Sequence, residues 1–301
     1  LADEKQPCTY EEKLHYLKTH IHFCSITRNM RHSYLYSQKL VELIASQPNR
    51  IYEERADYVT SLNNLVLAAS SIMKPDKTQD VFDKLQKAVI RFPSERHRII
   101  LGYNAMLNMY MKKGLFSEGR LYALEAEELL REYEEKIPAP VKIVLLYNLA
   151  RIYFITDDYK YSNRVLNQLL NETAPEVMED VQAAARILNL ILHYELEHYD
   201  LLPYLLRRIY YFLRKRKRIY KLESILLRFF DTLLSVNVHI KSELIDVLKK
   251  MKSELEKITD SPKETAALEY YFAYLSWIES KIENRPFADI MKEKAVEIKY
   301  D

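Results

Sequence analysis

Apolar and small side chains recur along this chain of 301 residues at offsets that place them on one face of an α-helix. The clearest copy of the pattern consists of Phe116, Gly119, Ala123 and Ala126. Other copies start at Tyr34, Thr78, Tyr159, Tyr199 and Lys241. Because successive copies begin about 41 residues apart, the pattern predicts a repeat of that length.

A second apolar stripe precedes the first one in the clearest repeats. In one repeat it consists of Tyr103, Met106, Leu107 and Tyr110. Gly114 then separates this stripe from Phe116, and Asp157 and Asp158 occupy the corresponding place in the next repeat. Glycine commonly ends a helix, so each repeat is predicted to be a helical hairpin. The chain is therefore predicted to be all-α, with about seven antiparallel hairpins.

The C-terminal residues 262–301 are predicted to form a capping hairpin. Phe287 and Ile290 begin another copy of the stripe, but the polar Lys294 and Glu297 occupy its later positions. A terminal repeat needs such a polar outer face, because no further repeat covers it. We find no linker or low-complexity stretch, so residues 1–301 are predicted to form a single continuous solenoid.

Composition narrows the possible folds and functions. The chain has only three glycines, and β-rich folds and phosphate-binding loops both depend on that residue. The net charge of +2 gives no global field that would attract nucleic acid or a membrane. No apolar run approaches the length of a membrane span. Cys8 and Cys24 are too few for a disulfide framework, so we expect a cytoplasmic protein.

The repeat at residues 103–126, with its Tyr–Gly–Phe–Ala–Ala arrangement, resembles a tetratricopeptide repeat, and residues 146–169 are similar. The resemblance implies a right-handed α-α superhelix whose concave face binds protein or peptide. The period is longer than the standard one, which implies longer helices, as in tetratricopeptide-like sensors. HEAT and armadillo repeats fit the period but not the Tyr–Gly–Phe turn.

Two further stretches, at residues 186–202 and 268–282, resemble uncharacterised tetratricopeptide-like proteins of Bacteroidetes. This resemblance extends over most of the chain. It implies the same fold and a bacterial origin, and it implies no activity.

The tetratricopeptide resemblance also implies which residues line the groove. They are first-helix residues outside the packing stripe: Asn104, Asn108, Met111, Tyr147, Asn148, Arg151, Phe154, Ile187, Ile191 and Tyr194. Asn108 and Asn148 match the asparagines with which some family members grip a peptide's terminal carboxylate. Asn104, Ala184 and Leu188 stand where that clamp needs basic or polar groups. The resemblance therefore implies an aromatic and amide groove for an extended or helical peptide.

The segment 207–221 is a second candidate site because it concentrates basic residues. Its candidate anion-binding residues are Arg207, Arg208, Arg214, Lys215, Arg216, Lys217 and Arg218. Tyr210, Tyr211 and Phe212 are interleaved with them, and aromatic rings among cations are typical of nucleic-acid binding. The alternative is a solvated C-terminal helix end, where the helix dipole stabilises positively charged side chains.

Two other clusters fit structural roles better than chemical ones. His20 and Cys24 share a helix face, as two metal ligands would, but no further ligands complete a site. His193, Glu195, Glu197 and His198 could support acid–base chemistry only if they were buried together. We therefore predict no catalytic residue, no metal and no cofactor.

The leading hypothesis is a non-catalytic scaffold that binds a protein or peptide on the concave face of the superhelix. One alternative is the effector-sensing half of a transcriptional regulator whose DNA-binding module is not part of this chain. Another alternative is nucleic-acid binding through residues 207–221.

Overall fold

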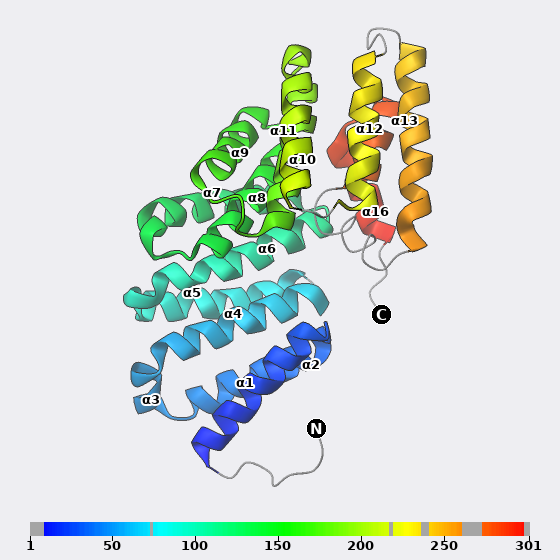
Figure 1. The fold of residues 1–301 in the computed structure, drawn as a ribbon. Helices are drawn as coiled ribbons and strands as arrows, with labels where there is room; N and C mark the ends of the chain where they lie inside the picture. The colour runs from blue at the N-terminus through cyan, green and yellow to red at the C-terminus, as the bar shows by residue number, and fades with distance from the viewer. Residues whose placement is uncertain (1–8, 73–74, 217–218, 236–240, 261–272, 298–301) are drawn as a thin grey trace. The chain divides into compact units, whose positions relative to one another are not determined.

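The computed structural model describes residues 9–72, 75–216, 219–235, 241–260 and 273–297, and it is helical throughout (Figure 1). These residues form 15 α-helices joined by short turns and 3-10 segments, with no strand among them. The all-α class predicted from the glycine count and the helical stripes is therefore confirmed.

The chain divides into two compact units. Of the described residues, those up to Lys112 and Leu121–Val141 form unit 1, and Lys113–Arg120 and those from Lys142 onward form unit 2. The sequence predicted one continuous solenoid over residues 1–301, and that prediction stays open.

Unit 1 is built mainly from the first helices of the chain. They are α1 (Tyr10–Ile26), α2 (Met30–Ala45), α3 (Pro48–Glu53), α4 (Arg55–Ile72), α5 (Pro75–Arg91) and α6 (Ile100–Lys112), with most of α7 (Phe116–Tyr133). The side chain of Thr9 caps α1 by accepting from the Glu12 backbone N–H, and the Glu12 carboxylate accepts from the Thr9 N–H. The backbone N–H groups of Thr9 and Glu12, which have no acceptor within the helix, are thereby hydrogen-bonded.

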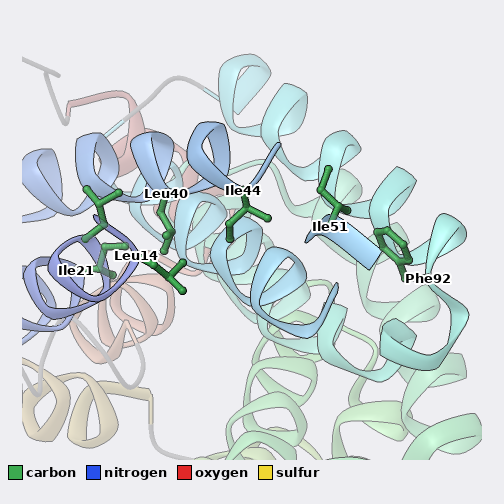
Figure 2. Close-up of a cluster of buried hydrophobic side chains, with 7 residues drawn as sticks. Leu14, Ile21, Leu40, Ile44, Ile51 and Phe92 are labelled. Carbon is green, nitrogen blue, oxygen red and sulfur yellow. The ribbon is translucent and has the colours of Figure 1, made fainter. Parts of the chain in front are cut away.

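A cluster of buried aliphatic side chains joins the first helices of unit 1 (Figure 2). Leu14 and Ile21 come from α1, Leu40 and Ile44 from α2, and Ile51 from α3. Each side chain is withdrawn from water by the neighbouring helix, so these amphipathic helices are stabilised by packing against one another.

Unit 2 contains most of the remaining helices. They are α8 (Ala139–Ile155), α9 (Tyr159–Glu172), α10 (Glu179–Glu195), α11 (Leu202–Lys215), α12 (Lys221–Ser235), α13 (Lys241–Glu256), α15 (Tyr274–Glu283) and α16 (Phe287–Glu297). The helices α15 and α16 form a hairpin within the predicted capping segment 262–301. The first part of that segment, residues 262–272, lies outside the described residues, as do residues 298–301.

Five of the hairpin turns contain a residue with a left-handed backbone conformation. These residues are Arg28, Gly114, Asp157, Glu197 and Asn284. In four of the turns the N–H of the following residue closes the helix end. Asn29 donates to the Cys24 carbonyl and Asp158 to the Tyr153 carbonyl at 2.8 Å, and His198 donates to the His193 carbonyl and Arg285 to the Ser280 carbonyl at 2.9 Å. This geometry satisfies carbonyls that the end of a helix leaves open.

The predicted stripes lie on the buried faces of the second helices. In α5, Thr78, Val81, Leu85 and Ala88 are all buried. In α9, Ser162, Leu166 and Leu169 are buried too. In α2, Ser37 and Ile44 of the predicted stripe are buried, but Leu40 is buried where the pattern predicted Val41. The side chain of Lys241, the first position of the weakest stripe, lies outside the described residues.

Candidate functional site

The predicted groove residues of unit 1 lie on α6. Asn104 and Met111 are buried, and Asn108 is half-buried. The Asn108 amide donates to the Asn104 carbonyl at 3.0 Å, one turn earlier on the same helix. These three positions therefore expose little side-chain surface to a peptide.

The predicted groove residues of unit 2 lie on α8 and α10, and all of them are buried. They are Tyr147, Asn148, Arg151, Phe154, Ile187, Ile191 and Tyr194. Arg151 donates to the Asn148 side-chain oxygen at 3.3 Å, and its guanidinium carbon lies 5.7 Å from the centre of the Tyr147 ring. Burial lowers the pKa of Arg151, since desolvation disfavours its charged form.

The C-terminal hairpin α15–α16 covers this face of unit 2. The Trp277 ring on α15 meets the Tyr194 ring edge-on at 5.9 Å between centroids. The Phe287 ring on α16 meets Phe154 in the same way, also at 5.9 Å. We call the α8 and α10 residues beneath this hairpin the first-helix face. The sequence predicted these residues to line an open groove, whereas a segment of the same chain lies on them.

Glu195, at the C-terminal end of α10, is the polar anchor of this contact. One carboxylate oxygen accepts from the Trp277 indole N–H at 2.7 Å, and the other accepts from the Lys281 ammonium. The Glu195 side chain is only 8% exposed. A buried carboxylate normally needs such partners, so the first-helix face selects an indole N–H and a cation one helical turn apart.

The hairpin is held at a second carboxylate as well. Burial opposes the ionisation of Glu279, yet ion pairs with Lys252 of α13 and Lys294 of α16 hold its pKa below the ordinary value. In α16, Lys292 and Ala295 approach the turn at Gly114 so closely that a Cβ atom there would lie 3.2 Å from the Lys292 Cα. The hairpin therefore packs against several elements of unit 2.

Unit 2 also contains an open pocket of about 650 Å³, which we call the arginine–tyrosine pocket. Its cations are Arg186 from α10 and Arg207, Arg208, Lys215 and Arg216 at α11. Its aromatic walls are Tyr204, Tyr211 and Phe212, and its carboxylates are Glu176 and Glu179. The volume falls within the range that small-molecule sites occupy.

The predicted anion-binding residues have different surroundings. Arg207 and Arg208 line the pocket and are exposed. Lys215 lines it too, but its ammonium pairs with Glu176 at 3.1 Å. Arg214 is exposed and lies outside the pocket lining. Lys217 and Arg218 lie outside the described residues.

Arg216 has a structural role in place of the anion-binding role that the sequence suggested. Its side chain is 3% exposed and donates to Glu223 at 2.6 Å and to Asp180 at 3.2 Å. Two carboxylates already neutralise this guanidinium, which ties the end of α11 to the starts of α10 and α12. The run of basic residues in the sequence did not reveal this, because both carboxylates come from other helices.

Arg186 is a candidate site residue that the sequence analysis missed. It is flanked by the buried Ala185 and Ile187, so the helical pattern placed it within a packed face. Its guanidinium lies over the Phe212 ring at 4.0 Å and lines the pocket. A single arginine within an apolar helix is the signal that could have identified it.

The candidate metal and acid–base residues are only partly brought together. His20 contacts the Tyr16 carbonyl at 2.9 Å, Cys24 is buried, and Cys8 lies outside the described residues. In the described part of the chain, no three His, Cys, Asp or Glu side chains converge as metal ligands would. His193 and His198 meet at 3.0 Å, whereas Glu195 is engaged by Trp277 and Lys281.

A scan against protein-family models finds no match to this chain, and a comparison with curated protein sequences finds none either. Within the described helices, none combines the length and the apolar character that crossing a membrane requires.

Proposed function

We propose that this chain is a tetratricopeptide-like helical repeat protein that binds protein partners and catalyses no reaction. The left-handed residues inside the helical hairpins support the repeat; Met178, which precedes α10 and so lies between two hairpins, is the other described residue with this conformation. Arg28, Gly114, Asp157, Glu197 and Asn284 follow one another at intervals of about 40 residues or about twice that. Those intervals match the period near 41 that the stripes predict. Hairpins of equal length that stack on their neighbours form the right-handed α-α superhelix of this class.

The observation that carries the proposal is the seating of α15–α16 on the first-helix face. Tyr194 and Glu195 hold α15 by one aromatic contact and one buried carboxylate, and Phe154 holds α16 by a second aromatic contact. We expect a partner of the same chemistry, a helix with tryptophan and lysine four residues apart, to compete with α15 for this face. Grooves commonly recognise helices through anchors at such spacings.

The test uses the full chain and a fluorescein-labelled peptide of residues 273–297. Wild-type protein should leave the anisotropy of the peptide unchanged, because the tethered helix has an effective concentration near the millimolar range. The Trp277→Ala/Lys281→Ala variant should bind the peptide, because its own α15 has lost both contacts to Glu195. Adding Glu195→Gln to that variant should weaken binding about tenfold, or about 1.4 kcal/mol.

A matched control peptide carries alanine at both Trp277 and Lys281 and should not bind. Hydrogen exchange of the double variant should show α15 released while α8 and α10 stay protected. If α15 is released and the wild-type peptide still does not bind, the first-helix face is not a helix-binding surface and the proposal fails.

A second candidate function, effector sensing in a regulator, is favoured by the arginine–tyrosine pocket alone. That pocket has the size of a small-molecule site, and its cationic and aromatic side chains could bind a small effector. Nucleic-acid binding through residues 207–221 is weakened as an alternative, since Lys215 and Arg216 are already paired with carboxylates.

A further inference from the structure

The arginine–tyrosine pocket carries positive charge that the described residues do not neutralise. Of its five cations, Lys215 pairs with Glu176 and Arg216 pairs with Asp180 and Glu223. Across the described part of the chain, no carboxylate pairs with Arg186, Arg207 or Arg208. Arg186 of α10 and Arg208 of α11 line the same pocket and repel each other, and an anion bound between them would relieve that repulsion.

Arg186 is oriented for such an anion. Its Nη1 group donates to the Gln182 backbone carbonyl at 2.9 Å and to the Gln182 side-chain oxygen at 2.7 Å. This leaves the edge formed by Nε and Nη2 without an acceptor among the described residues. That edge presents two parallel N–H groups, the geometry that binds a carboxylate or a phosphate in bidentate fashion.

The electrostatics of Arg186 agree with this geometry. Burial, and then the charge of Arg208, lower the pKa of Arg186 to about 10. Both causes disfavour the charged form, and an oxyanion beside the two guanidinium groups would favour it again. The ring of Phe212 lies beneath Arg186 and keeps its plane fixed, so little side-chain freedom remains to be lost on binding.

The remaining walls suit a planar ring attached to the anion. Tyr204 and Tyr211, about two turns apart on α11, line the pocket and expose 51% and 74% of their surface. Exposed tyrosine rings are good stacking surfaces for bases and other flat groups. Glu179 also lines the pocket, and its carboxylate can accept hydrogen bonds from hydroxyl or amino groups of a ligand.

We infer that the arginine–tyrosine pocket binds a small phosphorylated molecule with a planar ring, which is the chemistry of a nucleoside monophosphate. Arg186 and Arg208 bind the phosphate, and Tyr204 and Tyr211 stack on the ring. The site needs no glycine-rich loop, because guanidinium side chains replace the backbone amides that such loops provide. It is separate from the first-helix face, since its lining includes none of the residues Phe154, Tyr194 and Glu195 that contact the C-terminal hairpin.

A small ligand fits these observations better than a nucleic-acid strand does. A dianion balances two guanidinium groups, whereas the Glu176 and Glu179 carboxylates on the same lining would repel the next phosphate of a polymer. A strand would also be expected to follow all the basic residues of α11, including Arg214 outside the pocket.

The test is isothermal titration of the full chain with adenosine 5′-monophosphate at low salt. Arg208→Gln should weaken binding at least about tenfold, since it removes one of two cations from the phosphate. Arg186→Lys keeps the charge but loses the bidentate edge, and it should weaken binding by a similar factor. Tyr204→Ala should weaken it less, and Arg214→Gln, on the same helix outside the pocket, should leave it unchanged.

Three further probes separate the components of recognition. Adenosine and inorganic phosphate should each bind more weakly than the monophosphate, because each lacks one half of the contacts. A single-stranded thymidine oligonucleotide that binds more tightly than the monophosphate, and that Arg214→Gln weakens as much as Arg208→Gln does, would overturn the inference. So would absence of monophosphate binding by wild-type protein, or equal binding by wild-type and Arg208→Gln.

Discussion

His193 and His198 face each other across the turn between α10 and α11, with 3.0 Å between their Nδ1 atoms. In such a contact one nitrogen donates a proton and the other accepts it. If both Nδ1 atoms carried protons, the bond would be lost and two positive rings would be in contact. Burial, and then the charge of His198, accordingly lower the pKa of His193.

This pair makes stability depend on pH in a defined direction. The unfolded chain binds more protons than the folded chain once the pH falls below the ordinary histidine pKa of 6.5. The contribution of neutral His193 is therefore fully present above that value and is lost as the pH falls toward the lower pKa of the folded state. Urea denaturation at about pH 7.5 and about pH 5.5 should show a smaller loss of unfolding free energy for His193→Gln than for wild-type protein.

A companion measurement isolates the charge of His198. In His198→Ala, the pKa of His193 followed by NMR should rise toward 6.5, because the positive neighbour is gone. A pKa that does not move would mean that burial alone accounts for the shift.

At the scale of elements, different residue types adopt the same left-handed backbone conformation in the turns between helices. Gly114 adopts φ 70° and Glu197 adopts φ 58°. The left-handed region is open to glycine and costs other residues about 1 kcal/mol. Gly114 has a second constraint, because an added Cβ atom would lie 3.2 Å from the Lys292 Cα in α16. Within the part of the chain that the structure describes, the Glu197 side chain forms no hydrogen bond or ion pair that a glycine would remove.

The two turns therefore predict substitutions of opposite sign. Gly114→Ala should lower the free energy of unfolding by about 1–2 kcal/mol, through backbone strain and displacement of α16. Glu197→Gly should leave it unchanged or raise it by up to about 1 kcal/mol, because glycine accepts this conformation without strain. Both values come from urea denaturation followed by far-UV circular dichroism. If both variants lose stability, the left-handed backbone conformation does not determine the effect of these substitutions, and the prediction is wrong.

The stripes were predictable from sequence because they depend on neighbours within one hairpin. Thr78 and Val81 fall on a buried face wherever the helix is placed, provided that the spacing is helical. The displacement from Val41 to Leu40 in α2 was not predictable, since both residues are apolar and one residue of rotation decides between them. Arg186 was missed for a related reason: its pocket is completed by Phe212, which belongs to the next helix.

At the scale of the whole molecule, the cover on the first-helix face depends on contacts far apart in sequence. Glu195 and Trp277 are separated by 82 residues, and Glu195 and Lys281 by 86. The periodic pattern predicts which side chains of a helix are buried, but it does not predict which distant helix covers them. The sequence therefore could not indicate that α15 and α16 lie on the first-helix face.

The division into two compact units also makes a prediction about unfolding. Trp277 is the only tryptophan of the chain, and it is fully buried in unit 2. Its fluorescence therefore reports unit 2, whereas far-UV circular dichroism reports helices throughout the chain. If the units unfold separately, Leu40→Ala in α2 should lower the urea midpoint of the dichroism by about 1 M and leave the fluorescence midpoint unchanged.

The matched variant is Leu213→Ala in α11, where the leucine is also fully buried. It should lower the fluorescence midpoint by a similar amount, because the cavity then lies in the unit that contains Trp277. Repeat arrays unfold as one when the interfaces between neighbours are strong relative to the repeats themselves, and in parts when they are weak. Equal shifts of both midpoints in both variants would therefore show that the chain unfolds as the single continuous solenoid that its sequence pattern predicts.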